Sequence, residues 1–468
     1  MLDQTKAESI FKTIRKFASA SEVEVIFYAN NYSLTRFANN TIHQNVSELN
    51  EIASIRVAFD GKTARATTNR FDDESLKRAV KSAENIAKVQ EPDPERLPLA
   101  TAQETEEDKQ AETTKGDPRP NRWFEQTASI TPAERADAVG KIVAIAKKHK
   151  LTTAGIYSSS ESAEAIINSN GLSAFHQQTS AEVSITMLAE NSSGWQKANS
   201  PDVKNLDPAR LAEVAAQKAR DSQSPLELAP GKYTVVLEPA AVLDLVGFMF
   251  WDFGGLAILD QRSFLNNRIG TKLFGENVTI VDDVHHPLQS GAPFDGEGVR
   301  RQRVNLVEKG VIRNLVYARG TAAKMRKSEY AGKVGAIAPT GHGFPLPNEI
   351  GEAPMNIVFL TPGGEQTVDG MIAGTERGVL ITRLWYIREV DPYEKMLTGM
   401  TRDGTFLIEG GKVKQGIRNF RFNQSLITLL SNVEAMGQAV RASGEEAFDM
   451  VVPAMKVRDF NFTEVTRF

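Results

Sequence analysis

Metal chemistry is the first possibility to test, because histidine, cysteine and carboxylate spacing is readable directly. The chain has six histidines and no cysteine, and neither H-E-x-x-H nor H-E-x-x-x-H occurs in it. The densest group of ligand types is V-D-D-V-H-H-P, Val281 to Pro287. Adjacent side chains of a strand point to opposite faces, so we interpret this segment as a polar turn. A metal site there stays the alternative, to be decided by geometry.

Nucleophile and phosphate chemistry lack their usual motifs too. The sequence has no G-x-S-x-G elbow, no S-x-x-K paired with K-T-G, and no G-x-x-x-x-G-K-[ST] loop. The glycine-rich segment Gly332 to Gly343 does not open a predicted helix, so we expect a substrate-facing or structural loop. Asp244 and Asp252 could act as an acid and a base, but spacing alone does not establish such a pair. The absence of cysteine excludes disulfides and cysteine nucleophiles.

Composition narrows the class of protein. With 468 residues, 41% hydrophobic and 24% charged, the chain has the make-up of a soluble globular protein with two or three domains. Fifty-five Lys and Arg against fifty-nine Asp and Glu give a formal charge of -4, which provides no basic field for nucleic acid. The first residues mix charges and lack the apolar core of a secretory signal. We therefore expect a cytoplasmic protein that binds neither nucleic acid nor membranes.

One apolar run, Ala240 to Leu259, could be a membrane span, a buried core helix or an active-site helix. Asp244 and Asp252 would each cost about 2.5–3.5 kcal/mol at the centre of a membrane span, and Gly254 and Gly255 interrupt the run. The run is therefore expected in a core or a cleft of the folded chain.

The elements that would position these residues follow from the hydrophobic period. Apolar residues recur at helical spacing from Ile10 to Phe17 and then at alternate positions from Val23 to Phe27, which predicts a helix and a strand. The dipeptide Asp60-Gly61 predicts a tight hairpin. A second helix is predicted from Leu76 to Ala87. The first unit thus reads as helix, antiparallel meander, helix.

The same order of elements recurs further along the chain. Thr131-Pro132-Ala133-Glu134 combines a capping hydroxyl, a proline at the first helical position and a glutamate three residues after the cap, which predicts a helix start. Strands are predicted at Ala163 to Ile167 and Val183 to Met187, and Asp207-Pro208 begins a closing helix. We interpret this as an architectural repeat. Between the two units, prolines and charges predict a flexible linker, whose acidic run could alternatively contact a partner.

The remainder is richer in strands and turns. Strands are predicted at Tyr233 to Leu237 and at Val304 to Val307, and a late helix from Leu426 to Met436. The fold class is therefore α+β, with two helix–meander–helix units followed by a strand-rich C-terminal domain. The predicted divisions are residues 1–90 for the first α/β unit, 91–121 for the flexible linker, 122–228 for the second unit and 229–468 for the C-terminal domain.

Several blocks of sequence resemble the TldD/PmbA family, in the right order and over most of the chain. They are G-K-Y-T-V-V-L-E-P (231–239), F-D-G-E-G-V-R-R-Q-R (294–303), L-V-E-K-G-V-I-R-N (306–314), P-T-G-H-G (339–343) and T-G-M-T-R-D-G-T-F-L-I-E-G-G-K-V (398–413). The family label "modulator of DNA gyrase" is an indirect association that the charge balance does not support. The resemblance implies a C-terminal domain of the TldD/PmbA type.

In this family, TldD subunits resemble zinc peptidases whose H-E-x-x-x-H helix follows a strand like Tyr233 to Leu237, whereas PmbA, also called TldE, lacks those ligands. In this sequence, Ala240 to Gly255 occupies the position of that helix and has Leu, Val, Phe and Trp where the histidines and the glutamate would be. The resemblance therefore implies a subunit of PmbA/TldE type without metal, with zinc expected only in a TldD-like partner and a role in proteolysis or peptide maturation. We expect no cofactor and no catalytic residue in this chain, and take as candidate cleft or interface residues Trp251, Asp252, Arg402, Asp403 and Glu409.

Two other functions stay open. The chain could be a stand-alone homodimer that captures extended peptides at a sheet edge without catalysis, or an enzyme with unrecognised chemistry. A co-purifying chain with H-E-x-x-x-H would separate the subunit hypothesis from both.

Overall fold

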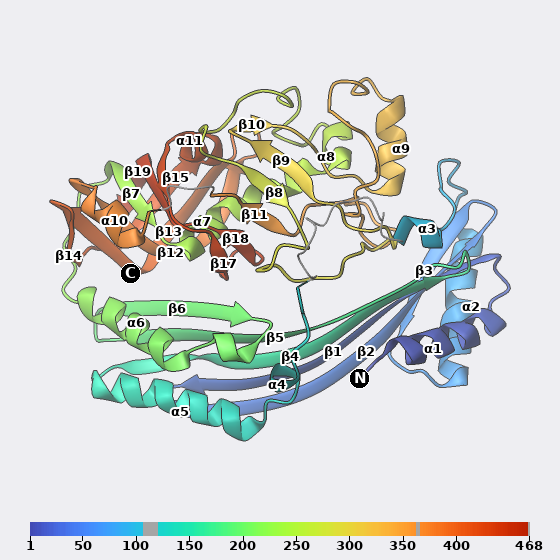
Figure 1. Cartoon of the computed structure of the whole chain (residues 1–468), viewed down its shortest axis with the longest axis horizontal. Coiled ribbons are helices and arrows are strands. Elements are labelled where there is room, and N and C mark those ends of the chain that lie inside the picture. The colour runs from blue at the N-terminus through green and yellow to red at the C-terminus, as the bar shows by residue number, and fades with distance from the viewer. Residues whose placement is uncertain (106–119, 362–365, 467–468) are drawn as a thin grey trace.

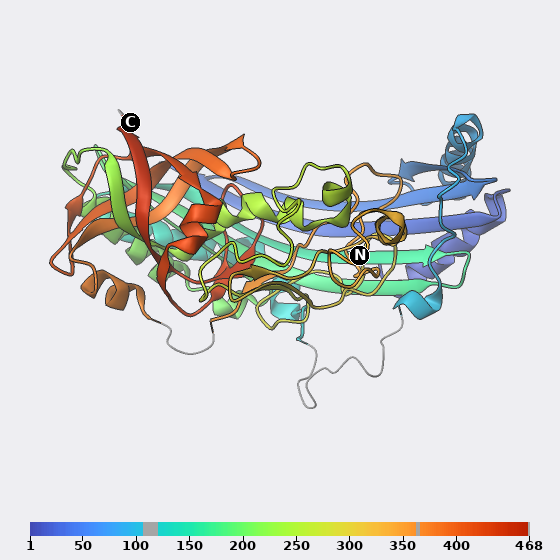
Figure 2. The same cartoon turned by 90° about the horizontal axis from the view of Figure 1, so that it is seen from above.

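The computed structural model describes residues 1–105, 120–361 and 366–466. A long, curved sheet forms one layer, and the C-terminal domain lies over one of its faces (Figure 1), as the view from above also shows (Figure 2). Within the described ranges, no helix combines the length and apolar character needed to cross a membrane. The α+β class with a strand-rich C-terminal domain is confirmed.

The repeat of helix, meander and helix is confirmed. The first unit consists of α1 (Gln4–Phe17), β1 (Glu22–Ala38), β2 (Thr41–Phe59), β3 (Lys62–Thr68) and α2 (Asp73–Val89). The second consists of α5 (Pro132–Lys148), β4 (Thr152–Asn168), β5 (Ser173–Leu188), β6 (Ser193–Ser200) and α6 (Pro208–Asp221). The shorter α3 (Ala102–Thr105), α4 (Glu125–Ala128) and η1 (Val203–Asn205) lie in the connections.

The sequence signals for these elements have the expected geometry. Asp60 and Gly61 adopt φ of 45° and 81° in the turn between β2 and β3. The Thr131 side chain accepts from the Glu134 amide while the Glu134 carboxylate accepts from the Thr131 amide, so the capping box is formed. Asp207 caps α6 by accepting from the Arg210 amide.

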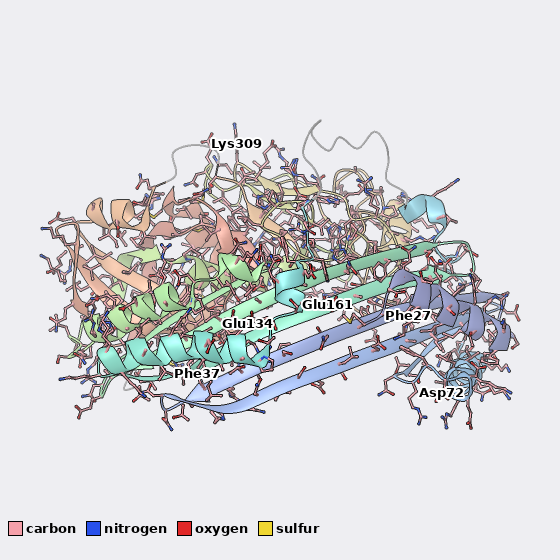
Figure 3. The ribbon with its side chains drawn as sticks, turned by 60° about the horizontal axis from the view of Figure 1, so that its bottom comes forward. Phe27, Phe37, Asp72, Glu134, Glu161 and Lys309 are labelled. Carbon is pink, nitrogen blue, oxygen red and sulfur yellow. The ribbon has the colours of Figure 1, made fainter. Side chains whose placement is uncertain are left out.

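The two units share one continuous sheet, which the sequence analysis did not predict. The strand order is β3-β2-β1-β4-β5-β6, and β1 pairs antiparallel with β4 from Glu24 opposite Asn168 to Phe37 opposite Gly155. All four long helices pack on the same face. α1 and α2 bury one end around Phe27, and α5 and α6 bury the other end around Phe37 (Figure 3). The opposite face is left for the C-terminal domain.

Within the described part of the predicted linker, Glu91 to Glu95 are exposed, whereas Leu99 and Ala100 pack against the sheet. Leu99 and Ala100 are 2% and 1% exposed. The Glu22 carboxylate accepts from the Leu99 amide and pairs with Arg96, and the Asn168 side chain donates to the Ala100 carbonyl at 2.8 Å. The segment 96–100 is thus held by Glu22 and Asn168, which are distant in sequence, so its own composition did not indicate these contacts. The rest of the predicted linker, 106–119, lies outside the described residues.

The C-terminal domain holds two sheets. In the first sheet, five strands close a ring in the order β12-β7-β19-β15-β13, because β13 also pairs with β12. β14 and β16 attach to this ring. These strands are β7 (Gly231–Leu237), β12 (Arg377–Asp391), β13 (Met396–Glu409), β14 (Lys412–Gly416), β15 (Phe420–Ser425), β16 (Val433–Met436) and β19 (Met455–Val465).

The second sheet has the order β10-β9-β8-β11-β18-β17. Its strands are β8 (Ile280–Asp282), β9 (Val304–Glu308), β10 (Val311–Ile312), β11 (Ile357–Phe359), β17 (Val440–Ala442) and β18 (Met450–Val452). The helical segments of the domain are α7 (Pro239–Val246), η2 (Gly247–Phe253), α8 (Gly255–Leu259), α9 (Arg319–Lys327), α10 (Val368–Ala373) and α11 (Leu426–Ser431).

The late helix is shorter than predicted. α11 ends at Ser431, and Val433 to Met436 form β16, which pairs with β19. Leu426, Leu429, Leu430 and Val433 are nevertheless all buried. The apolar spacing fits one long helix as well as a short helix followed by a strand. Pairing with β19 makes residues 433–436 a strand.

Candidate functional site

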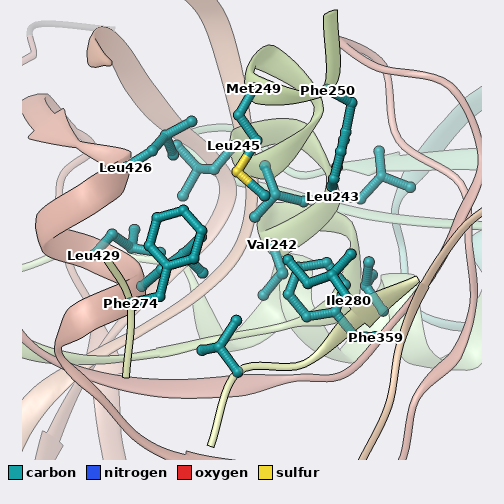
Figure 4. Packing of buried hydrophobic residues seen from close by; sticks show 14 of the residues in the cluster. Val242, Leu243, Leu245, Met249, Phe250, Phe274, Ile280, Phe359, Leu426 and Leu429 are labelled. Atoms are coloured by element: carbon teal, nitrogen blue, oxygen red, sulfur yellow. The ribbon is translucent and has the colours of Figure 1, made fainter. Parts of the chain in front are cut away.

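The apolar run, Ala240 to Leu259, forms part of the core, which is one of the two locations expected from the sequence. Pro239 occupies the first turn of α7, where its missing N–H costs nothing. The run then continues as η2 and α8, so it is three short segments instead of one long helix. Figure 4 shows Leu243, Leu245 and Phe250 packed among residues of the second C-terminal sheet and α11, including Ile280 and Leu429.

One ionisable side chain, Asp244, is buried in α7. Its carboxylate is 1% exposed, and Oδ1 accepts from the amides of Glu445 and Glu446 at 3.1 and 3.0 Å. Burial raises the pKa of Asp244 to about 7, while the two amides and the nearby Arg383 guanidinium oppose the rise. Asp244 therefore holds the loop around residues 445–446 against the end of α7.

The same loop passes very close to Gly247. A Cβ added there would lie 2.4 Å from the Cβ of Ala447. We expect Gly247→Ala to lower the free energy of unfolding by about 1–3 kcal/mol, because the loop must move to make room. Gly140 in α5 is the control: no atom lies within 4 Å of its added Cβ, and Gly140→Ala is expected to add about 0.5–1 kcal/mol. Urea unfolding of both variants tests this, and equal effects would contradict it.

A pocket of about 680 Å³ opens beside η2. Its walls include Phe248 and Trp251 from η2, Glu446 from the loop, and Glu389 and Lys395 from the β12–β13 hairpin. Aromatic surface and carboxylates are thus brought together from three parts of the C-terminal domain. This lining could hold an apolar side chain and hydrogen-bond the backbone of a peptide.

Trp251 and Asp252, two of the five predicted site residues, lie in this pocket. Trp251 is 44% exposed and stacks on Phe344 with ring centroids 5.9 Å apart. Asp252 is buried at the base, 2.5 Å from the Lys395 ammonium, which also pairs with Glu389 at 2.7 Å. Burial raises the pKa of Asp252, and Lys395 opposes the rise. Trp251 is the residue available to a ligand, whereas Asp252 fixes Lys395.

Arg402 and Asp403 lie on β13 in a different cluster, outside the pocket lining. Asp403 accepts from the Ser193 hydroxyl at 2.5 Å and lies 3.3 Å from Arg383 and 3.6 Å from Arg402. The Arg383 guanidinium lies 4.7 Å from the ring of Trp195 and 5.3 Å from that of Trp385.

Arg402 covers Trp385 in turn, with its guanidinium 4.7 Å from the ring. The residues Trp195, Arg383, Trp385 and Arg402 therefore alternate as a stack of rings and cations, which we call the Trp–Arg stack. Because Trp195 and Ser193 belong to β6, the stack joins the long sheet to the C-terminal domain.

Glu409 is the last residue of β13 and joins neither group. It lies opposite Arg377 of β12 and Lys412 of β14. Its position is that of a strand end before the Gly410-Gly411 turn. The structure thus brings together Trp251 with Asp252, and Arg402 with Asp403, and leaves Glu409 apart.

The residues of α7 do not fit a zinc ion. Apart from Asp244, whose Oδ1 is occupied by two amides, its side chains are apolar. Across residues 1–105, 120–361 and 366–466, no three His, Asp or Glu side chains are grouped as metal ligands. The segment 281–287, predicted to be a polar turn, begins within β8, which includes Val281 and Asp282, and only 283–287 follow the strand. The Arg122 guanidinium donates to three carbonyls there, those of Val284, His286 and Pro287.

Several site residues were missed by sequence reasoning. Lys395, Glu389 and Glu446 had no motif, because each is far in sequence from α7 and reaches the pocket only through folding. The partners in the Trp–Arg stack were missed for the same reason. The glycine-rich segment 332–343 opens no helix, and its His342 is buried and bonded to Asp282 at 2.9 Å, which is a structural role.

Comparison with known proteins defines the class and then the family. The fold, with its three successive parts, is that of a metallopeptidase-related chain: models described as PmbA/TldA metallopeptidase domain 1, central domain and C-terminal domain match residues 23–87, 125–223 and 230–464. This chain belongs to the PmbA/TldA metallopeptidase family, as the sequence motifs indicated.

Individual relatives are distant. Over 418 residues the chain is 19% identical to the metalloprotease PmbA of Escherichia coli O157:H7, which covers 86% of this chain and 84% of that protein. A 155-residue match to an uncharacterized protein of Methanocaldococcus jannaschii is 30% identical and spans 32% of this chain and only 36% of that protein. The crystal structure of TldE from Thermococcus kodakarensis superposes with a TM-score of 0.82 at 20% identity, over 98% of this chain and 99% of that one. This last likeness shows a shared fold.

Proposed function

We propose that this chain is the non-metal, PmbA/TldE-like subunit of a TldD/TldE-type metallopeptidase that acts on unfolded or extended peptides in the cytoplasm. The observation that carries the proposal is that α7 offers no side chain free to bind a metal. Its side chains are apolar or, in Asp244, bound to backbone amides, yet an open pocket is lined by η2, which follows it directly in the chain. A TldD-like partner would supply the zinc, which activates water in such peptidases. This chain would bind and orient the peptide.

Within this proposal the pocket residues have distinct tasks. Trp251 offers a partly exposed ring to an apolar peptide side chain, supported from behind by Phe344. Asp252 and Glu389 hold Lys395 in place, so the ammonium is fixed at the base of the pocket. Lys395 is 3% exposed and its third contact is the Phe248 carbonyl at 3.5 Å, so it shapes the base of the pocket and leaves ligand contact to Trp251.

The test is peptide hydrolysis by this chain alone, by a TldD-type zinc subunit alone and by the mixture, each with and without a chelator. We expect no hydrolysis by this chain and chelator-sensitive cleavage by the mixture. Trp251→Ala should raise KM of the mixture about tenfold, the equivalent of roughly 1.4 kcal/mol, through loss of the aromatic contact. Leu226→Ala is the control, since Leu226 is equally exposed at 44% but lies outside the pocket lining.

Chelator-insensitive turnover by this chain alone would contradict the proposal and favour an enzyme with unrecognised chemistry. A mixture whose activity equals that of the zinc subunit alone would show that this chain contributes nothing to cleavage.

A second function, a stand-alone homodimeric peptide-binding protein, is favoured by the edge of the long sheet. β3 pairs only with Ala53 to Phe59 of β2, which leaves Thr41 to Ile52 as an edge without a further strand in the described chain. An extended peptide can add to such an edge by backbone hydrogen bonds. Micromolar peptide binding by this chain alone, without cleavage in any mixture, would favour this function over the first.

A further inference from the structure

The lining of the pocket beside η2 carries more negative than positive charge. It contains four carboxylates and two cations, namely Asp252, Glu389, Glu445 and Glu446 against Arg262 and Lys395. The charged side chains just outside the lining do not remove this excess, because they are two cations and two carboxylates, namely Lys197, Arg388, Glu182 and Asp260. The pocket and its surroundings therefore keep an excess of two negative charges.

Two of the four carboxylates still have free acceptor positions. Glu389 uses Oε1 to pair with Lys395 at 2.7 Å, and no donor of the described chain reaches its Oε2. Glu445 lies 3.8 Å from the Lys197 ammonium, which is shared with Glu182 at 3.3 Å. Neither oxygen of Glu445 accepts a hydrogen bond from a described residue. The side chains of Glu389 and Glu445 are 31% and 33% exposed, so a ligand can reach both.

The other two carboxylates are held by the backbone. Asp252 accepts from the Phe264 amide at 3.0 Å, and Glu446 accepts from the Tyr386 amide at 2.6 Å. Their side chains are only 6% and 15% exposed. Glu389 of the β12–β13 hairpin is therefore left for a ligand together with Glu445 of the facing loop.

Aromatic side chains complete the lining. Trp251 is 44% exposed, and the ring of Phe344 stacks beside it with the two planes 26° apart. Phe248 and Phe448 are partly exposed and line the same pocket. A ring that can receive an apolar side chain also attracts a cation, and a planar guanidinium stacks flat on it. A side chain that combines an apolar stem with a positive charge therefore fits this lining better than a purely apolar one.

We propose that the pocket receives an arginine side chain of the bound peptide, with the guanidinium on the Trp251 ring and its charge offset by Glu389 and Glu445. The inference rests on the proposed function and names the class of peptide that this chain would bind. The pocket volume of about 680 Å³ lies within the usual range for ligands, about 300–1,000 Å³. Arginine should bind better than lysine, because its planar fork can form two parallel hydrogen bonds with a carboxylate.

The test is isothermal titration calorimetry of this chain alone with capped, alanine-rich peptides that differ at one central position. That position holds arginine, its uncharged isostere citrulline, lysine or leucine. We expect the arginine peptide to bind about tenfold more tightly than the citrulline peptide, because hydrogen bonds to the charged group are lost with the charge. Equal binding of these two peptides, binding of neither, or tighter binding of the leucine peptide overturns the proposal.

Substitutions in the chain locate the arginine site. Glu389→Gln and Glu445→Gln should each lower the preference for arginine over citrulline about threefold, and the double variant should abolish it. Glu434→Gln is the matched control, since Glu434 is 39% exposed and pairs with Lys456 at 3.3 Å but lies outside the pocket lining. An arginine preference that survives in the double variant contradicts this site.

This test can fail separately from the peptidase proposal. Chelator-sensitive cleavage by the mixture, together with equal binding of the arginine and citrulline peptides, would leave the peptidase proposal standing and remove the arginine pocket. Tight binding of the arginine peptide by this chain, without cleavage in any mixture, would support the pocket and remove the peptidase role.

Discussion

Replacing Arg383 by leucine is expected to lower the free energy of unfolding by about 3–5 kcal/mol. The Arg383 and Asp403 side chains are each 6% exposed and lie 3.3 Å apart. Removing the guanidinium leaves the Asp403 carboxylate buried with the Ser193 hydroxyl and only the more distant Arg402 as a cation. The same change removes the cation between Trp195 and Trp385, so the contact that joins β6 to the C-terminal domain is lost as well.

Arg402→Leu is the matched control. Arg402 touches the same carboxylate and the same Trp385 ring, but its side chain is 47% exposed, so the expected loss is below about 1 kcal/mol. The double variant Arg383→Leu/Asp403→Asn should recover much of the loss, because no charge is then left buried without its partner. Denaturant unfolding of the three variants measures this. A loss for Arg383→Leu no larger than that for Arg402→Leu would show that the buried pair is not a main contact between the domains.

Asp244→Asn is expected to change how stability depends on pH. Burial raises the pKa of Asp244 from 3.8 to about 7, so the folded chain holds this proton more tightly than the unfolded chain. The resulting stabilisation is complete below about pH 4 and is lost as the pH rises through about 7. Asparagine keeps an oxygen for the Glu445 and Glu446 amides but does not ionise. We therefore expect the variant to match the parent near pH 4 and to exceed it by roughly 2–4 kcal/mol at pH 8.

The measurement is the free energy of unfolding of both proteins at several pH values between 4 and 8. Asp260→Asn serves as the control, since the Asp260 side chain is 49% exposed and its substitution should leave the pH dependence unchanged. A difference between Asp244→Asn and the parent that stays constant across this range would show that Asp244 does not titrate there.

Turns and helix caps were predictable from the sequence because the residues that form them are neighbours in the chain. The Asp60-Gly61 turn, the capping box at Thr131 and Glu134, and the cap at Asp207 each depend on residues within a few positions of one another, and each is formed. The predicted end of the late helix was wrong because Val433 continues the helical apolar spacing but pairs with β19 as a strand residue. Competition between those two outcomes is settled by β19, which local sequence does not reveal.

The site was predictable only in part, for the same reason. Trp251 and Asp252 could be named because they stand in the run that the family resemblance singled out, and both line the pocket. Lys395 and Glu446 reach the pocket from distant segments, and the joining of the two units through β1 and β4 also depends on pairing distant residues. Arg402 and Asp403 were named as a pair and lie together, but in the Trp–Arg stack and not in the pocket.

The position of β19 sets the order in which the C-terminal domain can be completed during synthesis. β19 lies between β7 and β15 in the closed ring of strands, although β7 precedes it by more than two hundred residues. Until residues 455–465 have been made, β7 and β15 each expose an edge, and the ring cannot close. Pairings between such distant segments form slowly, and exposed strand edges invite aggregation in the meantime. We therefore expect the nascent chain to depend on chaperones late in translation, at a stage when its long N-terminal sheet can already be folded.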